Sequence, residues 1–141
     1  ENIIKDKPIE VYNFGNHIRD FTYIDDITEA LTRILESPPS FNKTWDSKIP
    51  DPATSHAPWK IYNIGNSNPV NLLDYIHAIE KALNKKAIIK YLPLQPGDVP
   101  STHADVEDLK REFDYKPETK VENGIKEFTE WYIDFYKIRL N

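Results

Sequence analysis

The sequence contains no cysteine and no methionine, and glycine occurs only four times in 141 residues. Without cysteine, the chain can form neither a disulfide framework nor a thiolate metal site. The glycines are Gly15, Gly65, Gly97 and Gly124, which lie too far apart for a Gly-x-Gly-x-x-Gly turn or a phosphate-binding P-loop. Dinucleotide binding by a glycine-rich turn is therefore excluded for this stretch of sequence.

Residue patterns for catalysis are also missing. No tyrosine has a lysine four positions later, and no serine or threonine lies in a nucleophile elbow. The four histidines do not fall at a metal-ligand spacing, so we expect no metal site. Asp25 and Asp26 are a candidate acid and base, but acids are common in a first helical turn and neighbouring helix residues point in different directions. We predict no catalytic, metal-binding or cofactor-binding residue here.

The charge and hydropathy of the chain exclude two classes of partner. Its net charge is −5 and it has no basic block, which argues against nucleic acid or an anionic membrane surface. No apolar run approaches the length of a membrane span, and no signal peptide is visible. We expect a soluble, cytoplasmic protein that is long enough to form one core.

Hydrophobic periodicity predicts a mixed α/β unit with a thin sheet and several amphipathic helices. Capping boxes are expected at Thr22 with Asp25 and at Thr119 with Glu122, and Asn71 is expected to cap a further helix. The expected strands cover residues 9–12, 61–64 and 88–92, and the expected helices cover residues 24–35, 72–83, 105–113 and 121–135.

Two features indicate part of a larger protein. The sequence begins like the last turn of a helix, stopped by Pro8, and the apolar helix faces exceed what three short strands can cover. We interpret residues 1–141 as a single fragment whose uncovered apolar faces favour a homo-oligomer. Residues 37–59 form a proline-rich insertion, which Trp45 and Trp59 are expected to anchor on the surface.

The segment from Gly15 to Phe21 contains the first candidate binding motif. A glycine-bearing turn can bring backbone close to a ligand, and the guanidinium of Arg19 suits bidentate contact with phosphate. Asp20 would form an ion pair with Arg19 and so fix the orientation of its guanidinium. The alternative is a surface ion pair between Arg19 and Asp20 that adds little stability. From spacing alone, the surface pair is the favoured interpretation.

The loop from Gln95 to Pro100 is the second candidate motif. Pro96 fixes one dihedral angle and Gly97 can take a positive φ, so that a stiff turn presents Asp98 as a hydrogen-bond acceptor. An ordinary connection between a strand and a helix is an equally good interpretation.

The remaining candidates are a tyrosine and the histidines. Tyr12 lies at the end of the first expected strand and could stack on a nucleotide base, although such a tyrosine is more often half-buried packing. We interpret His17, His77 and His103 as surface or packing residues without a role.

Taken in order, these motifs resemble those of the extended short-chain dehydrogenase/reductases. The resemblance rests on residues 9–13, 19–27, 62–65 and 95–105, and it covers residues 1 to about 136. Within that family the sequence is most similar to bacterial nucleotide-sugar epimerases of the UDP-glucuronate 4-epimerase type, which serve capsule polysaccharide synthesis.

The resemblance implies an α/β fold, namely the C-terminal substrate-binding lobe of an enzyme in the NAD(P)-binding Rossmann superfamily. The NAD-binding loop and a Tyr-x-x-x-Lys pair would lie in an N-terminal half that this sequence lacks. NAD bound there oxidises C4 of the UDP-sugar transiently, and return of the hydride inverts C4. The fragment is expected to be inactive alone, with the UDP-sugar and that N-terminal half as its partners.

The resemblance also implies substrate-binding roles. The backbone of Val11 and Tyr12 would lie against the uracil, with the Tyr12 ring stacked on the base. Arg19 matches an arginine on the diphosphate, and Asp98 matches an acid near the ribose. Many relatives have a second diphosphate-binding arginine where Gln95 stands, so the contact at that position stays open. The alternatives are a UDP-glucose 4-epimerase, a UDP-glucuronate decarboxylase, a 4,6-dehydratase or a non-catalytic nucleotide-sugar-binding module.

Overall fold

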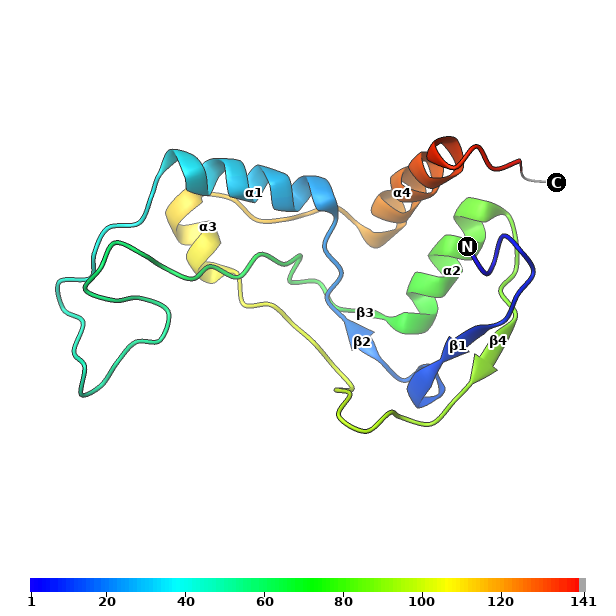
Figure 1. Cartoon of the computed structure of the whole chain (residues 1–141), viewed down its shortest axis with the longest axis horizontal. Coiled ribbons are helices and arrows are strands. Elements are labelled where there is room, and N and C mark those ends of the chain that lie inside the picture. The colour runs from blue at the N-terminus through cyan, green and yellow to red at the C-terminus, as the bar shows by residue number, and fades with distance from the viewer. Residues whose placement is uncertain (140–141) are drawn as a thin grey trace. The chain divides into compact units, whose positions relative to one another are not determined.

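The computed structural model describes residues 1–139, and the chain divides into two compact units (Figure 1). Unit 1 consists of residues 1–21, 68–103 and the chain from 119 onward, and unit 2 consists of residues 22–67 and 104–118. Both units are discontinuous in sequence. All of the predicted substrate-binding residues fall in unit 1.

Unit 1 contains two small sheets, and the predicted α/β class is confirmed. β1 (Ile9–Val11) pairs in parallel with β4 (Ile89–Tyr91). β2 (Ile18–Arg19) pairs antiparallel with β3 (Val70–Asn71). The strands expected at residues 9–12 and 88–92 are therefore confirmed, whereas β2 and β3 are too short to give an alternating pattern.

The strand expected at residues 61–64 is wrong. In unit 2 the N–H of Ile61 donates to the carbonyl of Ala53, and Lys60 forms an isolated bridge with Thr54. Alternation favours an extended backbone, but a strand also needs a continuous neighbour with free N–H and C=O groups. The proline-rich stretch opposite supplies a single bridge instead of a ladder.

α2 (Leu72–Leu83) and α4 (Val121–Phe135) pack side by side in unit 1 (Figure 1). Asn71 is the N-cap of α2 as predicted, whereas Lys120 and not Thr119 is the N-cap of α4. The two helices bury apolar side chains together with β1 and the N-terminal turn. The buried apolar residues of this core are Ile3, Val11, Ile76, Ala78, Leu83 and Ile125.

In unit 2, α1 (Ile24–Glu36) contacts α3 (Glu107–Phe113). The guanidinium of Arg33 donates to the carbonyl of Phe113 at 3.2 Å and lies 4.8 Å from the centre of the Tyr115 ring. Tyr23 is the N-cap of α1, one residue after the predicted Thr22. Both helices lie where the periodicity predicts them, with boundaries shifted by one or two residues.

The insertion at residues 37–59 has no helix or strand, and the contacts of its Trp45 lie within the insertion itself. Trp45 is half-buried, donates from Nε1 to the carbonyl of Asp51 at 3.2 Å and contacts the His56 ring. Trp59 is exposed, so its predicted anchoring role is wrong. The insertion thus folds on itself through local contacts around Trp45.

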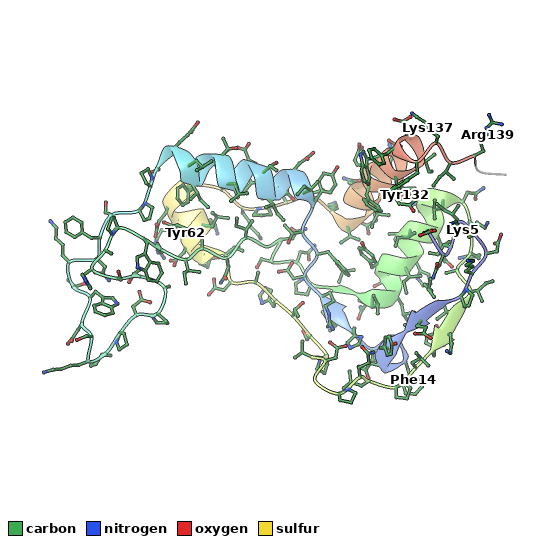
Figure 2. The ribbon with its side chains drawn as sticks, in the orientation of Figure 1. Lys5, Phe14, Tyr62, Tyr132, Lys137 and Arg139 are labelled. Carbon is green, nitrogen blue, oxygen red and sulfur yellow. The ribbon has the colours of Figure 1, made fainter. Side chains whose placement is uncertain are left out.

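A polar network ties residues 60–62 to α3. The hydroxyl of Tyr62 donates to Glu112 Oε2 at 2.6 Å, and Lys60 Nζ pairs with Glu112 and, at 3.2 Å, with Asp108. Figure 2 shows Tyr62 beside this helix. Burial and the hydrogen bond to Glu112 raise the pKa of Tyr62. Burial opposes ionisation of Glu112, but the hydrogen bonds from Lys60, Tyr62 and Arg111 outweigh it and lower the pKa of this carboxyl.

Replacing Glu112 tests this network. We expect Glu112→Gln to lower the free energy of unfolding by about 1–2 kcal/mol at pH 7, because Lys60 loses one of its two charged partners. The lowered pKa of Glu112 means that its contribution is present above the ordinary value of 4.5 and is lost as pH falls through the folded value. Urea unfolding of both proteins at pH 7 and pH 3.5 measures the difference.

The matched control is Glu107→Gln on the same helix, because the Glu107 side chain is 73% exposed and its nearest cation lies at 4.0 Å. Equal effects of the two substitutions, or an effect of Glu112→Gln that is as large at pH 3.5 as at pH 7, would show that the Glu112 network does not stabilise unit 2.

Candidate binding site

Backbone hydrogen bonds hold the two candidate motifs together in unit 1. The N–H of Ile18 donates to the carbonyl of Pro100 at 2.9 Å, and the N–H of Thr102 donates to the carbonyl of Ile18 at 3.1 Å. These bonds place residues 95–100 directly beside β2. The structure therefore brings together Arg19 and Asp98, which are far apart in sequence.

Arg19 forms an ion pair with Asp98. Nη2 of Arg19 lies 3.0 Å from Asp98 Oδ1, and Nη1 donates to the carbonyl of Ile18 at 3.0 Å. The side chain of Arg19 is 23% exposed, so the ion pair is partly desolvated and still reachable. A guanidinium has five N–H donors, and several of them remain for a ligand after these two bonds. This geometry fits a preorganised anion contact better than a mobile surface pair.

A tight turn positions Asp98 as the sequence predicts. The turn at Pro96 and Gly97 closes with a bond of 3.1 Å from the N–H of Asp98 to the carbonyl of Gln95, and Gly97 has a φ of +85°. The N–H of Val99 donates to Oδ1 of Asp98 at 2.8 Å, which fixes the carboxylate. The side chain of Gln95 is exposed beside this turn.

The acid that supports Arg19 differs from the one expected. Asp20 is the predicted partner, but the structure gives this role to Asp98. The carboxylate of Asp20 accepts from the N–H of Asn68 at 3.4 Å, and its own N–H donates to Thr102 Oγ1 at 3.3 Å. Adjacent residues of a strand point to opposite faces, so an acid next to Arg19 in sequence is poorly placed to pair with it.

His17 is a site residue that the sequence analysis missed. Its side chain is only 4% exposed, and Nε2 lies 3.1 Å from Oδ2 of Asp98, although not in hydrogen-bond geometry. The signal for it is the spacing His17-Ile18-Arg19, because alternate residues of an extended segment share a face. Arg19 and His17 thus contact opposite oxygens of the same carboxylate.

Val11 and Tyr12 lie at the end of β1, where the chain enters a short 3₁₀ segment (Tyr12–Gly15). Val11 is buried, and its carbonyl accepts from the N–H of Leu92 at 2.9 Å. Tyr12 is half-buried, and its hydroxyl donates to Oε2 of Glu10 at 3.1 Å, a bond that raises the pKa of Tyr12. The hydroxyl of Tyr12 is thus held by Glu10, while the side chain remains partly accessible to solvent.

The turn after Tyr12 is strained. Asn13 and Phe14 have φ values of +50° and +52°, and Gly15 follows at +85°. Left-handed backbone is unusual for a bulky residue such as Phe14, which is 57% exposed and is labelled in Figure 2. This turn redirects the chain from β1 to β2 within a few residues. Tyr12 thus follows the last residue of β1, and Arg19 is the last residue of β2.

The chemistry that this site offers is binding rather than bond making. The ion pair joins a partly desolvated guanidinium to a fixed carboxylate, and Tyr12 supplies an aromatic ring after the end of β1. Groups of these kinds suit a phosphate, a hydroxyl and a planar base. Within residues 1–139, no group of three or more His, Cys, Asp or Glu side chains is placed to hold a metal ion, and no helix is long and apolar enough to cross a membrane.

Comparison with known proteins identifies related chains. The model of the family described as GDP-mannose 4,6 dehydratase matches residues 2–128. The chain is 52% identical over 135 residues to Protein CapI of Staphylococcus aureus, a match that covers 96% of this chain and 40% of that protein. It is 40% identical over 132 residues to a probable UDP-glucuronate 4-epimerase of Rhizobium meliloti, covering 93% of this chain and 39% of the relative.

The fold of this chain is also similar to that of a solved structure. The UDP-glucuronic acid 4-epimerase of Bacillus cereus, in complex with UDP-glucuronic acid and NAD, matches with a TM-score of 0.74 and 26% identity. The match covers 96% of this chain and 38% of that chain. The chain therefore spans about two fifths of the length of its relatives.

The turns that carry the site make a prediction about stability. Gly15 and Gly97 both have a φ of +85°, but a Cβ on Gly15 would lie 2.8 Å from Leu73 Cδ2, whereas a Cβ on Gly97 would meet nothing within 4 Å. We expect Gly97→Ala to cost about 1 kcal/mol of unfolding free energy through backbone strain alone. Gly15→Ala should cost about 1–2 kcal/mol more, because Leu73 must move. Equal losses in chemical denaturation would show that the packing of Leu73 on Gly15 does not matter.

Proposed function

Because the chain belongs to the GDP-mannose 4,6 dehydratase family, we propose that it is the substrate-binding part of an NAD-dependent nucleotide-sugar 4-epimerase that acts on UDP-glucuronate. Family membership confirms the resemblance to extended short-chain dehydrogenase/reductases. The proposal of UDP-glucuronate is supported by the similarity to the epimerases of Rhizobium meliloti and Bacillus cereus. The observation that carries the proposal is the ion pair between Arg19 and Asp98. This pair holds the guanidinium in a fixed orientation in which it could bind a nucleotide diphosphate.

These residues do not fit an NAD site of their own. The sequence has no glycine-rich turn and no Tyr-x-x-x-Lys pair, and the chain covers 38% of a relative solved with NAD. We therefore place NAD, and the hydride transfer that it supplies when bound, in the remaining part of a full-length enzyme. The residues of this chain bind and orient the UDP-sugar so that C4 of the sugar can face that cofactor.

Arg19 would hold the diphosphate. Two of its nitrogens are already engaged by Asp98 and the carbonyl of Ile18, so the guanidinium plane is fixed before a ligand arrives. Fixing the plane lowers the conformational entropy that binding must remove. Partial burial strengthens the attraction to phosphate relative to a fully exposed arginine. Arg19 is thus the residue that we expect to contribute most to affinity within this chain.

The other site residues would hold the nucleoside. Asp98 retains lone pairs on Oδ2 and can accept from a ribose hydroxyl. The ring of Tyr12 would stack on the uracil, with Val11 as the buried wall behind it. The exposed amide of Gln95 would donate to the diphosphate from the rim of the turn. The role of Asp98 rests on its contact with Arg19, whereas the roles of Val11, Tyr12 and Gln95 rest on the resemblance of residues 9–13 and 95–105 to those of related enzymes.

A sugar 4,6-dehydratase is the second candidate, because the matching family is described by that activity. Both reactions begin with a nucleotide sugar, so the site in this chain suits either of them. A panel of UDP-glucuronate, UDP-glucose and GDP-mannose, supplied to the full-length enzyme, distinguishes the candidates by the product formed. We expect UDP-galacturonate from UDP-glucuronate.

We also propose that this chain self-associates in the cytoplasm, where nucleotide sugars are used. The support is the apolar surface that α1 leaves uncovered, at Ile24, Leu31 and Leu35, the last of which is 81% exposed. In unit 1, α4 separately exposes Phe128, Trp131 and Phe135. Patches of this kind favour association. Sedimentation of the chain as a monomer at high concentration would contradict this proposal.

Replacing Arg19 tests the proposed function. In the full-length enzyme, Arg19→Ala should weaken UDP-glucuronate binding by about 2–4 kcal/mol, because the phosphates lose a desolvated charged partner. Isothermal titration calorimetry measures the change. The control is Arg111→Ala on α3, whose side chain is 63% exposed and pairs with Asp108 and Glu112. A loss below about 0.5 kcal/mol for Arg19→Ala would make this arginine a surface residue and remove the main support for the site.

A further inference from the structure

The proposed function leaves one buried titratable group at the site without a role. His17 is 4% exposed, and its Nε2 has no hydrogen-bond partner although Oδ2 of Asp98 is 3.1 Å away. A buried polar atom without a hydrogen bond is costly, and one that lies beside a carboxylate becomes favourable if it carries a proton. His17 is therefore a buried group whose Nε2 lies beside a carboxylate without a hydrogen bond.

The charges at the site determine what a proton on His17 would do for ligand binding. Arg19 and Asp98 together carry no net charge, so a diphosphate that approaches Arg19 also approaches the carboxylate of Asp98. Two like charges at such separations repel unless a third charge compensates them. An imidazolium at His17 would compensate Asp98 from its buried side. The positive charge of Arg19 would then be available to the phosphates.

We propose that His17 is a positioning residue that takes up a proton from solvent when a nucleotide diphosphate binds to Arg19. The proton adds to Nε2, no other bond forms or breaks, and the charge of the imidazolium then lies 3.1 Å from Oδ2 of Asp98. The charge on His17 then compensates the carboxylate of Asp98, and the guanidinium of Arg19 can bind the ligand. This inference rests on the proposed function and adds a link between affinity and pH.

The contacts of His17 and of the elements packed against it define which charged groups lie near its ring. Asp98 faces it from the loop after β4, and Arg19 faces the same carboxylate from β2. On the side of α2, the N–H of Leu72 donates to the carbonyl of His17, and the first acid of that helix is Asp74, whose carboxylate accepts from Asn71. Asp98 is therefore the acid whose negative charge a proton on Nε2 would compensate.

The test measures UDP-glucuronate binding to the full-length enzyme at pH 6 and pH 8. Both phosphates of this ligand are esterified, so they do not titrate in that range as a terminal phosphate with a pKa of about 6 would. Because histidine changes charge between about pH 5 and 8, we expect binding to be about three- to tenfold tighter at pH 6. Calorimetry at pH 7 in two buffers of different ionisation enthalpy should show net proton uptake.

His17→Gln should remove both the pH dependence and the proton uptake while binding persists. The matched control is His77→Gln, an exposed histidine on α2 in the same unit, which should behave like the unsubstituted enzyme. If His17→Gln does not fold, side-chain NMR of the unsubstituted enzyme replaces it, and the His17 ring should become imidazolium on addition of ligand at pH 7.

Two outcomes would overturn the inference in distinguishable ways. Binding whose pH dependence is the same in the enzyme and in His17→Gln, or a His17 ring that stays neutral in the complex, rejects the role of His17 and leaves the proposed function standing. No binding of UDP-glucuronate at either pH rejects the proposed function itself and the inference with it.

Discussion

The ion pair between Arg19 and Asp98 is the interaction on which the site depends. It joins β2 to the loop after β4, two segments that lie together because Ile18 exchanges backbone bonds with Pro100 and Thr102. Backbone bonds set the position, and the turn at Gly97 sets the direction of the carboxylate. The side-chain pair then fixes the guanidinium plane. An ion pair that is still partly open to solvent contributes little to stability, so its value lies in preorganisation for an anion.

The strained turn from Asn13 to Gly15 is the second constraint on the site. Left-handed backbone at three successive residues costs free energy that packing elsewhere must offset. The turn reverses the chain between β1 and β2 in a few residues. It therefore separates the end of β1, next to Tyr12, from β2, which carries Arg19, by only a few residues.

Much of the fold follows from local pattern, and most of the site does not. The helices α1, α2 and α4 appear in the apolar spacing, and the turn at Pro96 and Gly97 follows from the two residue types. The strand expected at 61–64 fails because strand formation depends on a partner that local sequence does not reveal. The pairing of Arg19 with Asp98 instead of Asp20, and the burial of His17, depend equally on contacts between distant segments. Motif order gives Arg19 and Asp98 among the candidates Val11, Tyr12, Arg19, Gln95 and Asp98, whereas only the three-dimensional structure brings these two together with His17.

The central claim is that Arg19 holds the diphosphate of a UDP-sugar against a carboxylate that the fold has already placed. A crystal structure of the full-length enzyme with UDP-glucuronate tests it most directly. We expect phosphate oxygens at about 2.8 Å from the guanidinium nitrogens of Arg19, with Asp98 still beside it and the uracil against Tyr12. A nucleotide bound elsewhere, with Arg19 contacting only Asp98 and the carbonyl of Ile18, would contradict it.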